Sequence, residues 1–199
     1  MGTFKRFQLE INSLPKEQQS LFCCGACEHI LPFFEYFRSS SKPRELLNAE
    51  WSFCLGSGEQ ESLTELAKSV SEVIPDNTEE DDLPSQIAMF SAVPVLEVLD
   101  LLLDKRSECA VRAASAPLEV LQLVHLFIDE PMHAEFELFD IVDNPSIVPK
   151  EIHHEWNLLG SMLRELSAKA ISLSEWRGAQ VARGSGLIDF YREQLNRTG

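Results

Sequence analysis

Positive charge is scarce in this chain. Of its 199 residues only 17 are lysine or arginine, against 32 aspartate and glutamate, so the formal net charge at pH 7 is -15. A charge of this sign and size disfavours binding to nucleic acid phosphates and to anionic lipid surfaces. We therefore expect neither nucleic acid nor a membrane as a partner. If the charge serves recognition, the partner is a basic protein.

Familiar chemical motifs are missing as well. Neither Gly-Ser-Gly sequence, at residues 56–58 and 184–186, continues into a phosphate-binding Gly-x-Gly-x-x-Gly loop, and no serine stands in a nucleophile elbow. The five cysteines are odd in number and mostly lie within apolar helical patterns, unlike the disulfide framework of a secreted protein. No apolar run of a signal peptide follows Lys5 and Arg6. We expect a cytoplasmic protein without a cofactor, and rather not an enzyme.

Segments with the alternating pattern of β-strands are absent too, which predicts an all-α fold. The stretch Ile87–Leu103 is the most apolar in the chain, and we predict that it forms the central helix, about 84–104, of a compact bundle. Glu97 and Asp100 would sit inside hydrocarbon if this segment crossed a bilayer, so a membrane span is disfavoured. No linker or repeat divides the chain, and we expect a single helical domain over residues 1–199.

The rest of the chain carries helical periodicity. Pro32, Pro94 and Pro117 lie inside predicted helices and should bend them, because proline cannot donate the backbone hydrogen bond. Apolar residues recur at steps of four and three over residues 152–173, a seam that would either pack in the bundle or join two copies of the chain in a homodimer. The further predicted helices cover about 15–38, 43–55, 59–74, 107–128, 134–142, 150–173, 173–183 and 187–196.

The negative charge is unevenly distributed. Residues 59–82 and residues 119–155 each hold nine acidic side chains against one lysine, whereas residues 160–199 are slightly basic. If the two acidic segments lie side by side, one face would carry a negative field able to steer a basic partner. Solubility alone is the alternative explanation.

Residues 23–27, Cys-Cys-Gly-Ala-Cys, contain a Cys-x-x-Cys pair. Redox use of such a pair requires a thiol of lowered pKa, usually at a helix N-terminus, whereas these thiols lie in the middle of an apolar helical pattern. A structural zinc would need two more ligands, and no second pair of matching spacing exists. We predict that these cysteines pack in the core.

The pattern Glu-x-x-His occurs twice and gives an alternative function, a metal-dependent helical enzyme. Di-metal carboxylate bundles use one such motif from each of two helices and one glutamate from each of two others. Against this, a proline follows the first glutamate, and the two motifs are too close in sequence for two full bundle helices. The candidate ligands are Glu130, His133, Glu151 and His154, with Glu28 and Glu97 from other helices.

A third alternative is a small-molecule pocket lined by aromatic side chains between bent helices. Ordinary core packing is the competing interpretation of these aromatics. The residues that would line the pocket are Phe33, Phe34, Trp51 and Trp156. The histidines at positions 29, 125 and 153 border polar helical faces, and we expect them on the surface.

One stretch of the sequence resembles a known family. Residues 27–32, Cys-Glu-His-Ile-Leu-Pro, are similar to the N-terminal signature of the DUF416 (YjaG-like) family of bacterial proteins, and the resemblance extends from about residue 9 to 190. It implies an all-α fold in a family without an established activity, cofactor or catalytic residue. The positions that align with the family pattern are Leu14, Gln18, Phe22, Cys27, Glu28, His29, Pro32, Phe37, Trp51, Ile74, Pro75, Glu155 and Trp156.

The chain also departs from the family pattern. His29 stands where arginine is usual, Phe34 where tyrosine is common, and Ser91 where the central helix carries aspartate. If those polar positions serve the family's function, this chain's version of it differs. The candidate site residues that the resemblance singles out are Cys27, Glu28, His29, Pro32, Trp51, Glu155 and Trp156.

The charge and the missing chemistry together favour a non-enzymatic interaction or regulatory protein that presents a negative surface to a basic protein. An immunity-type or inhibitor-type binder is one form of this, because such proteins often block basic, nucleic-acid-directed targets. The family motif would mark a site if Glu28, His29, Glu155 and Trp156 meet around an accessible cleft. It would serve only the fold if they are scattered or buried.

Overall fold

The computed structural model describes residues 3–75, 82–104, 107–128, 148–168 and 172–198. These residues form eight α-helices and contain no strand, so the all-α prediction is confirmed. The predicted helix 134–142 lies outside the described residues, as do residues 76–81 of the acidic segment 59–82. The helices are α1 (Thr3–Ser13), α2 (Lys16–Phe37), α3 (Lys42–Cys54), α4 (Gln60–Ser71), α5 (Leu83–Asp104), α6 (Ser107–Ile128), α8 (Lys150–Ser167) and α9 (Leu173–Thr198).

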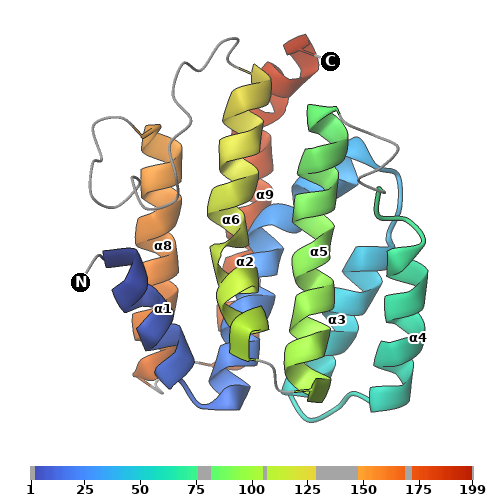
Figure 1. The fold of residues 1–199 in the computed structure, drawn as a ribbon, viewed down its shortest axis with the longest axis vertical. Coiled ribbons are helices and arrows are strands. Elements are labelled where there is room, and N and C mark those ends of the chain that lie inside the picture. Colours follow the sequence, from blue (N-terminus) through green and yellow to red (C-terminus); the bar gives the residue numbers. More distant parts are fainter. Residues whose placement is uncertain (1–2, 76–81, 105–106, 129–147, 169–171, 199) are drawn as a thin grey trace.

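The helices form a bundle around α2. Figure 1 shows α5 and α6 side by side in front of α2, with α1 and α8 along one edge and α3 and α4 along the other. Helix α9 packs along α2 from the far side. Buried apolar side chains from all eight helices belong to one hydrophobic cluster. Pro32, Pro94 and Pro117 lie inside α2, α5 and α6, where the sequence places them.

The most enclosed helix is α2 rather than the more apolar α5. Every residue from Gln19 to Leu31 is buried, although this segment includes Glu28 and His29. The predicted apolar helix is present as α5, which packs against α6 and α2 and leaves part of one side half-exposed. Hydropathy does not predict that α2 is the most enclosed helix, because α2 contains polar residues. These residues are buried because they find partners on other helices, and the composition of α2 alone does not show those partners.

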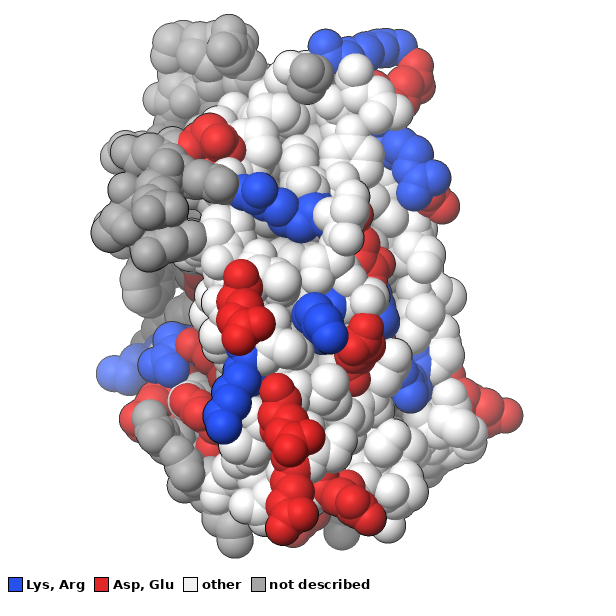
Figure 2. All heavy atoms as spheres, turned by 90° about the vertical axis from the view of Figure 1, so that its right-hand side faces the viewer, with Lys and Arg blue, Asp and Glu red and all other residues white. Residues whose placement is uncertain are grey.

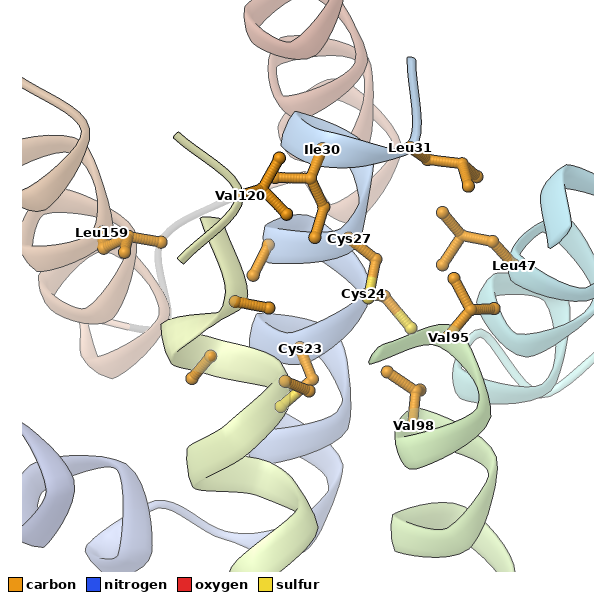
Figure 3. Close-up of a cluster of buried hydrophobic side chains, with 14 of the residues drawn as sticks. Cys23, Cys24, Cys27, Ile30, Leu31, Leu47, Val95, Val98, Val120 and Leu159 are labelled. Atoms are coloured by element: carbon orange, nitrogen blue, oxygen red, sulfur yellow. The ribbon is translucent and has the colours of Figure 1, made fainter. Parts of the chain in front are cut away.

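The cysteines of α2 pack in the core, as predicted. Cys23, Cys24 and Cys27 are fully buried among aliphatic side chains, and all five cysteines of the chain are free. Figure 3 shows Cys24 directed toward Val95 and Leu47, whereas Cys23 lies on the side of α6. The Cys23 thiol donates a hydrogen bond to the Ala110 carbonyl at 3.4 Å.

The sequence pattern does not indicate helix α1, and one predicted helix break is absent. Residues 3–13 form the amphipathic helix α1, because Phe4, Phe7 and Ile11 lie at helical spacing and are buried against the bundle. The predicted break at residues 184–186 does not exist, and α9 runs through it without interruption. The glycine at position 184 is used for close packing, as described below, and not for a turn.

Helices α5 and α6 are long and apolar enough to span a membrane by length and composition alone. About half of each helix is buried inside the bundle, where the two pack against each other and against α2. Core helices of globular proteins meet the same criterion.

Candidate functional site

Two consecutive residues of α2, Glu28 and His29, place polar groups inside the core on different sides of the helix. They are 1% and 0% exposed. A buried charge is costly unless other groups pair with it and satisfy its hydrogen bonds. The partners of these two residues therefore define what the family motif does in this fold.

The Glu28 carboxylate is paired by side chains of α3 and α9. The Trp51 indole donates from Nε1 to Oε1 of Glu28 at 2.9 Å, and Arg44 donates from Nη1 to Oε2. The Arg177 guanidinium approaches Oε1 at 3.6 Å and lies 5.4 Å from the centre of the Trp51 ring, a cation–π arrangement. Arg44 also donates to Glu35 at 2.8 Å. The buried carboxylate is thus satisfied at both oxygens.

The His29 imidazole faces an oxygen at each ring nitrogen. Nδ1 lies 2.5 Å from Oε1 of Glu155, and Nε2 lies 3.0 Å from Oε1 of Gln180. The Gln180 amide donates from Nε2 to the Trp176 carbonyl, and Arg183 donates to its Oε1, so its oxygen is turned toward His29. Since both ring nitrogens face acceptors, each must donate, and His29 is an imidazolium.

The electrostatics of this site agree with its geometry. Burial lowers the pKa of His29, but the Glu155 carboxylate and the hydrogen bonds to Glu155 and Gln180 outweigh burial and raise it. Glu155 belongs to α8 and Gln180 to α9, so the charged imidazole ties both helices to α2. The buried imidazole therefore contacts both C-terminal helices.

Gly184 explains why α9 can approach α2 so closely. A Cβ atom at this position would lie 2.0 Å from the Glu28 carbonyl oxygen and 3.1 Å from the His29 Cα. No side chain can be accommodated at those distances, because the nearest atoms are backbone. The glycine therefore lets α9 pack against the backbone of the motif itself.

Trp156 does not join the other motif residues. Its ring packs against Phe7 and Phe4 of α1, with centroids 4.9 and 6.3 Å away. Glu28 and His29 are buried, and Glu155, although 2% exposed, lines a groove between α8 and α9, so the four residues do not surround one shared cleft.

The remaining motif residues have other surroundings. Trp51 donates a hydrogen bond to Glu28, and Cys27 is a core residue. Pro32 lines a groove between α2 and α9.

The prediction that His29 and His125 lie on the surface is wrong. His29 is buried as described, and His125 is buried next to Tyr191, whose hydroxyl lies 2.8 Å from Nε2. Both rings find partners on other helices, which a helical wheel of their own segment cannot show. His153 is half-exposed. Sequence reasoning also missed Gln180, Arg44, Arg177 and Arg183, which carry no local signal that separates them from surface residues.

The metal alternative finds no assembled site in the part of the chain that is described. Glu28 is paired with Arg44 and Trp51, and Glu97 receives a hydrogen bond from Arg112. No group of three His, Cys, Asp or Glu side chains among the described residues is placed to hold a metal ion. Glu151 and His154 line a groove beside α8, whereas Glu130 and His133 lie outside the described residues.

The predicted aromatic pocket does not exist. Phe33, Phe34 and Trp51 are fully buried, and Trp156 is half-buried. Phe33 packs on Tyr191, and Trp51 packs on Trp176, so the rings lie in separate parts of the core. Core packing, the competing interpretation, describes these residues.

A groove of about 490 Å³ runs between α8 and α9. Its wall is largely apolar, with Leu158, Leu187 and the exposed ring of Phe190. Both signs of charge occur along it, with two cationic side chains and two carboxylates. The polar residues along it are Lys150, Glu151, His154, Glu155 and Arg183.

The seam over residues 152–173 is used within the chain. Ile152, Leu159, Leu163 and Leu166 are buried, and α8 packs on α6, α2 and α1. These four side chains pack inside the single chain, and the homodimer stays a prediction.

Helix α4 carries the clearest charged surface. Its buried side faces the bundle through Leu63 and Val70, and four exposed glutamates and one exposed lysine, Lys68, lie on or next to it. No ion pair joins these five residues to any residue that the structure describes. Figure 2 views this side of the bundle and shows acidic side chains gathered toward its lower end, with both signs alternating above. The α4 acidic face consists of Glu59, Glu61, Glu65 and Glu72.

Comparison with known proteins identifies the family. The sequence model of DUF416, described as a protein of unknown function, matches residues 6–179. Among solved structures, a DUF416 family protein from Shewanella baltica OS155 is similar, with a TM-score of 0.66 and 16% sequence identity over 100% of this chain and 95% of that one. No protein with a curated description matches.

Proposed function

We propose that this chain, which belongs to the DUF416 family of proteins of unknown function, is a non-enzymatic interaction protein that binds a basic protein through the α4 acidic face. The observation that carries the proposal is the set of four exposed glutamates on and beside α4 that form no ion pair with the described residues. A surface charge that is left unpaired inside its own protein remains available to a partner of opposite sign.

The burial of the family motif supports this proposal, because buried residues leave recognition of a partner to the surface. Glu28, His29 and Glu155 are each 2% exposed or less, and each is held by specific partners in the core. Groups in that position stabilise helix packing and are poorly placed to reach a substrate. The motif therefore serves the scaffold, and recognition falls to the surface.

The net charge of -15 supports the same role. A strongly negative protein repels nucleic acids and anionic lipids, and its field accelerates encounter with a positively charged protein. Such a partner and this chain would meet in the cytoplasm. An immunity-type or inhibitor-type role is one form of the proposal, because a target that works on nucleic acid carries the basic surface required.

Two charge-matched variants test the proposal. One replaces Glu59, Glu61, Glu65 and Glu72 by glutamine. The other replaces four exposed carboxylates that already have a basic partner within the chain, so it changes the net charge equally elsewhere. Those four are Glu10, Glu45, Asp189 and Glu193.

Both variants and the unmodified protein are used as bait in cell extract, with captured proteins quantified by mass spectrometry. We expect a basic protein that the unmodified bait and the matched control retain and the α4 variant loses. Its retention should fall steeply toward about 1 M salt, where charges more than about 3 Å apart are screened. Equal retention by the two variants, or retention unchanged by salt, would contradict the proposal.

A further inference from the structure

The glutamates that are buried among the described residues differ in how their carboxyl oxygens are satisfied. Glu28 has partners at both oxygens. Glu50 has a partner at neither, and both of its orphaned oxygens are closed to solvent. Glu155 is satisfied at one oxygen only, because Oε1 faces His29 and Oε2 has no hydrogen-bond partner in the described part of the chain.

Oε2 of Glu155 is not sealed in the core. The buried side-chain atoms that lack a partner among the described residues are Oε1 of Gln19 and the two oxygens of Glu50, so Oε2 of Glu155 touches solvent. Glu155 lines the groove between α8 and α9. The groove therefore has a carboxylate oxygen in its floor, on a side chain that is otherwise buried and held by His29.

The walls of the groove are apolar and partly uncovered. Leu158 and Leu187 are half-buried, and the Phe190 ring is 55% exposed. Gly186 adds room, because a Cβ atom at this position would meet nothing within 4 Å. The volume of about 490 Å³ falls within the range of small-molecule sites. A ligand that covers these walls gains free energy from the apolar surface that it removes from water.

The charges around Oε2 favour a neutral hydrogen-bond donor. The His29 imidazolium, 2.5 Å from Oε1, already balances the Glu155 carboxylate, and Arg183 also lines the groove. A cationic ligand would add an excess of positive charge at a poorly solvated place, and an anionic ligand would be repelled by Oε2. Arg183 has N–H groups besides the one that it gives to Gln180, so it can donate to a ligand oxygen. A hydroxyl group meets both requirements, because it donates and accepts.

We propose that the groove between α8 and α9 binds an uncharged alcohol, whose hydroxyl donates to Oε2 of Glu155 and whose apolar body lies against Leu187 and Phe190. The hydroxyl takes the place of water at Oε2 without loss of the hydrogen bond. The ligand and His29 use different oxygens of Glu155, so the contact between α2 and α8 is kept. The groove lies on the edge of the bundle away from α4 (Figure 1), and this site does not depend on the α4 acidic face.

The first test compares three ligands of equal chain length with different head groups. The full folded chain is titrated with n-octanol, octanoate and octylamine and followed by NMR. We expect n-octanol to shift the resonances of the groove residues and to bind at least about tenfold more tightly than either charged ligand.

The second test fills the groove without changing a contact of the core. Gly186→Leu places a side chain in the open space of the groove and should weaken the binding of n-octanol at least about tenfold. Gly178→Leu is the matched control. It makes the same change in the same helix, also where nothing lies within 4 Å of the new Cβ, but it does not line the groove, so the affinity should stay unchanged.

Several outcomes would overturn the proposal. Octanoate or octylamine binding as tightly as n-octanol would contradict the hydroxyl chemistry. Shifts that fall outside α8 and α9, or no shift at all, would contradict the site, as would equal affinity of the two leucine variants for n-octanol. If Gly186→Leu does not fold, nuclear Overhauser contacts between n-octanol and the Phe190 ring of the unmodified chain decide the question, and their absence overturns the proposal.

Discussion

Nδ1 of His29 lies 2.5 Å from Oε1 of Glu155, across 126 residues of sequence, with both side chains buried. The pair joins α2 to α8, and the other ring nitrogen joins α2 to α9 through Gln180. Because the imidazole must donate from both nitrogens, the contact is an ion pair inside the core. The polar contacts that join α8 and α9 to α2 at this point therefore depend on the charge of His29.

Glu155→Gln tests this ion pair. The variant keeps an oxygen near His29 but removes the negative charge, and we expect the free energy of unfolding to fall by about 3 kcal/mol below neutral pH. The pKa of His29 is raised in the folded state from its ordinary 6.5, so the stabilisation is fully present below pH 6.5 and is lost as the pH rises through the folded-state pKa.

The measurement is urea unfolding of both proteins across this range. The stability difference should be largest on the acid side of the His29 transition and should shrink on the alkaline side. Glu193→Gln, at an exposed ion pair with Arg197, is the control and should show a difference below about 1 kcal/mol throughout. A Glu155→Gln deficit that does not change with pH would mean that His29 is neutral.

Gly184→Ala tests the close approach of α9 to α2. Because its Cβ would meet the Glu28 carbonyl oxygen at 2.0 Å, the helices must separate, and we expect a loss of at least about 2 kcal/mol in the free energy of unfolding. Gly178→Ala is the matched control in the same helix, since nothing lies within 4 Å of its added methyl group. That variant should gain roughly 0.5–1 kcal/mol from helix propensity. Equal effects of the two changes would rule out the packing explanation.

Trp51→Phe tests the support of Glu28. The change removes the indole donor to a fully buried carboxylate but keeps an aromatic ring, and we expect a loss of about 1–3 kcal/mol in the free energy of unfolding. Trp176→Phe removes a comparable bond, from its Nε1 to Glu165 at 3.0 Å, where the carboxylate is partly solvated. It should cost less, because water replaces the lost donor. The same thermal or urea unfolding assay measures both, and a larger loss for Trp176→Phe would contradict this account of Glu28.

Glu50→Gln tests the orphaned carboxyl group. The pKa of Glu50 is raised well above its ordinary 4.5, so the folded state binds a proton that the unfolded state releases, and stability falls as the pH rises between the two pKa values. Glutamine removes this dependence. Within that pH window, the free energy of unfolding of the variant should therefore rise relative to that of the wild type by up to about 1.4 kcal/mol per pH unit. Glu61→Gln, at an exposed position of α4, should leave the pH profile unchanged. Parallel profiles for Glu50→Gln and wild type would show that Glu50 is not buried as a neutral acid.

Local patterns predicted the helices well because helical periodicity is a property of neighbouring residues. The apolar spacing in α4, α5, α6 and α8 marks their buried sides. Proline marks the starts of α2, α3, α5 and α8. The polar core could not be predicted in the same way. His29 finds Glu155 and Gln180 at separations of 126 and 151 residues, and nothing in its own segment distinguishes it from a surface histidine.

The predicted helix break at residues 184–186 is wrong for a related reason. In sequence, Gly184-Ser185-Gly186 looks like a helix break, since glycine disfavours the helix interior. In the fold, the missing side chain is what the Glu28 backbone requires, and the packing of α9 on α2 outweighs the local preference. The family motif of Glu28 and His29 is conspicuous in sequence, yet only the tertiary contacts reveal that both side chains are buried and paired with residues of other helices.

Zero-length cross-linking of this chain to its partner tests the central claim most directly. A carbodiimide joins carboxylates to lysine amines only when they are in contact, and mass spectrometry identifies the carboxylates used. We predict that cross-links to a basic protein fall on Glu59, Glu61, Glu65 and Glu72, and that they disappear at high salt. Cross-links concentrated instead on Glu10, Glu45, Asp189 or Glu193 would contradict recognition through the α4 acidic face.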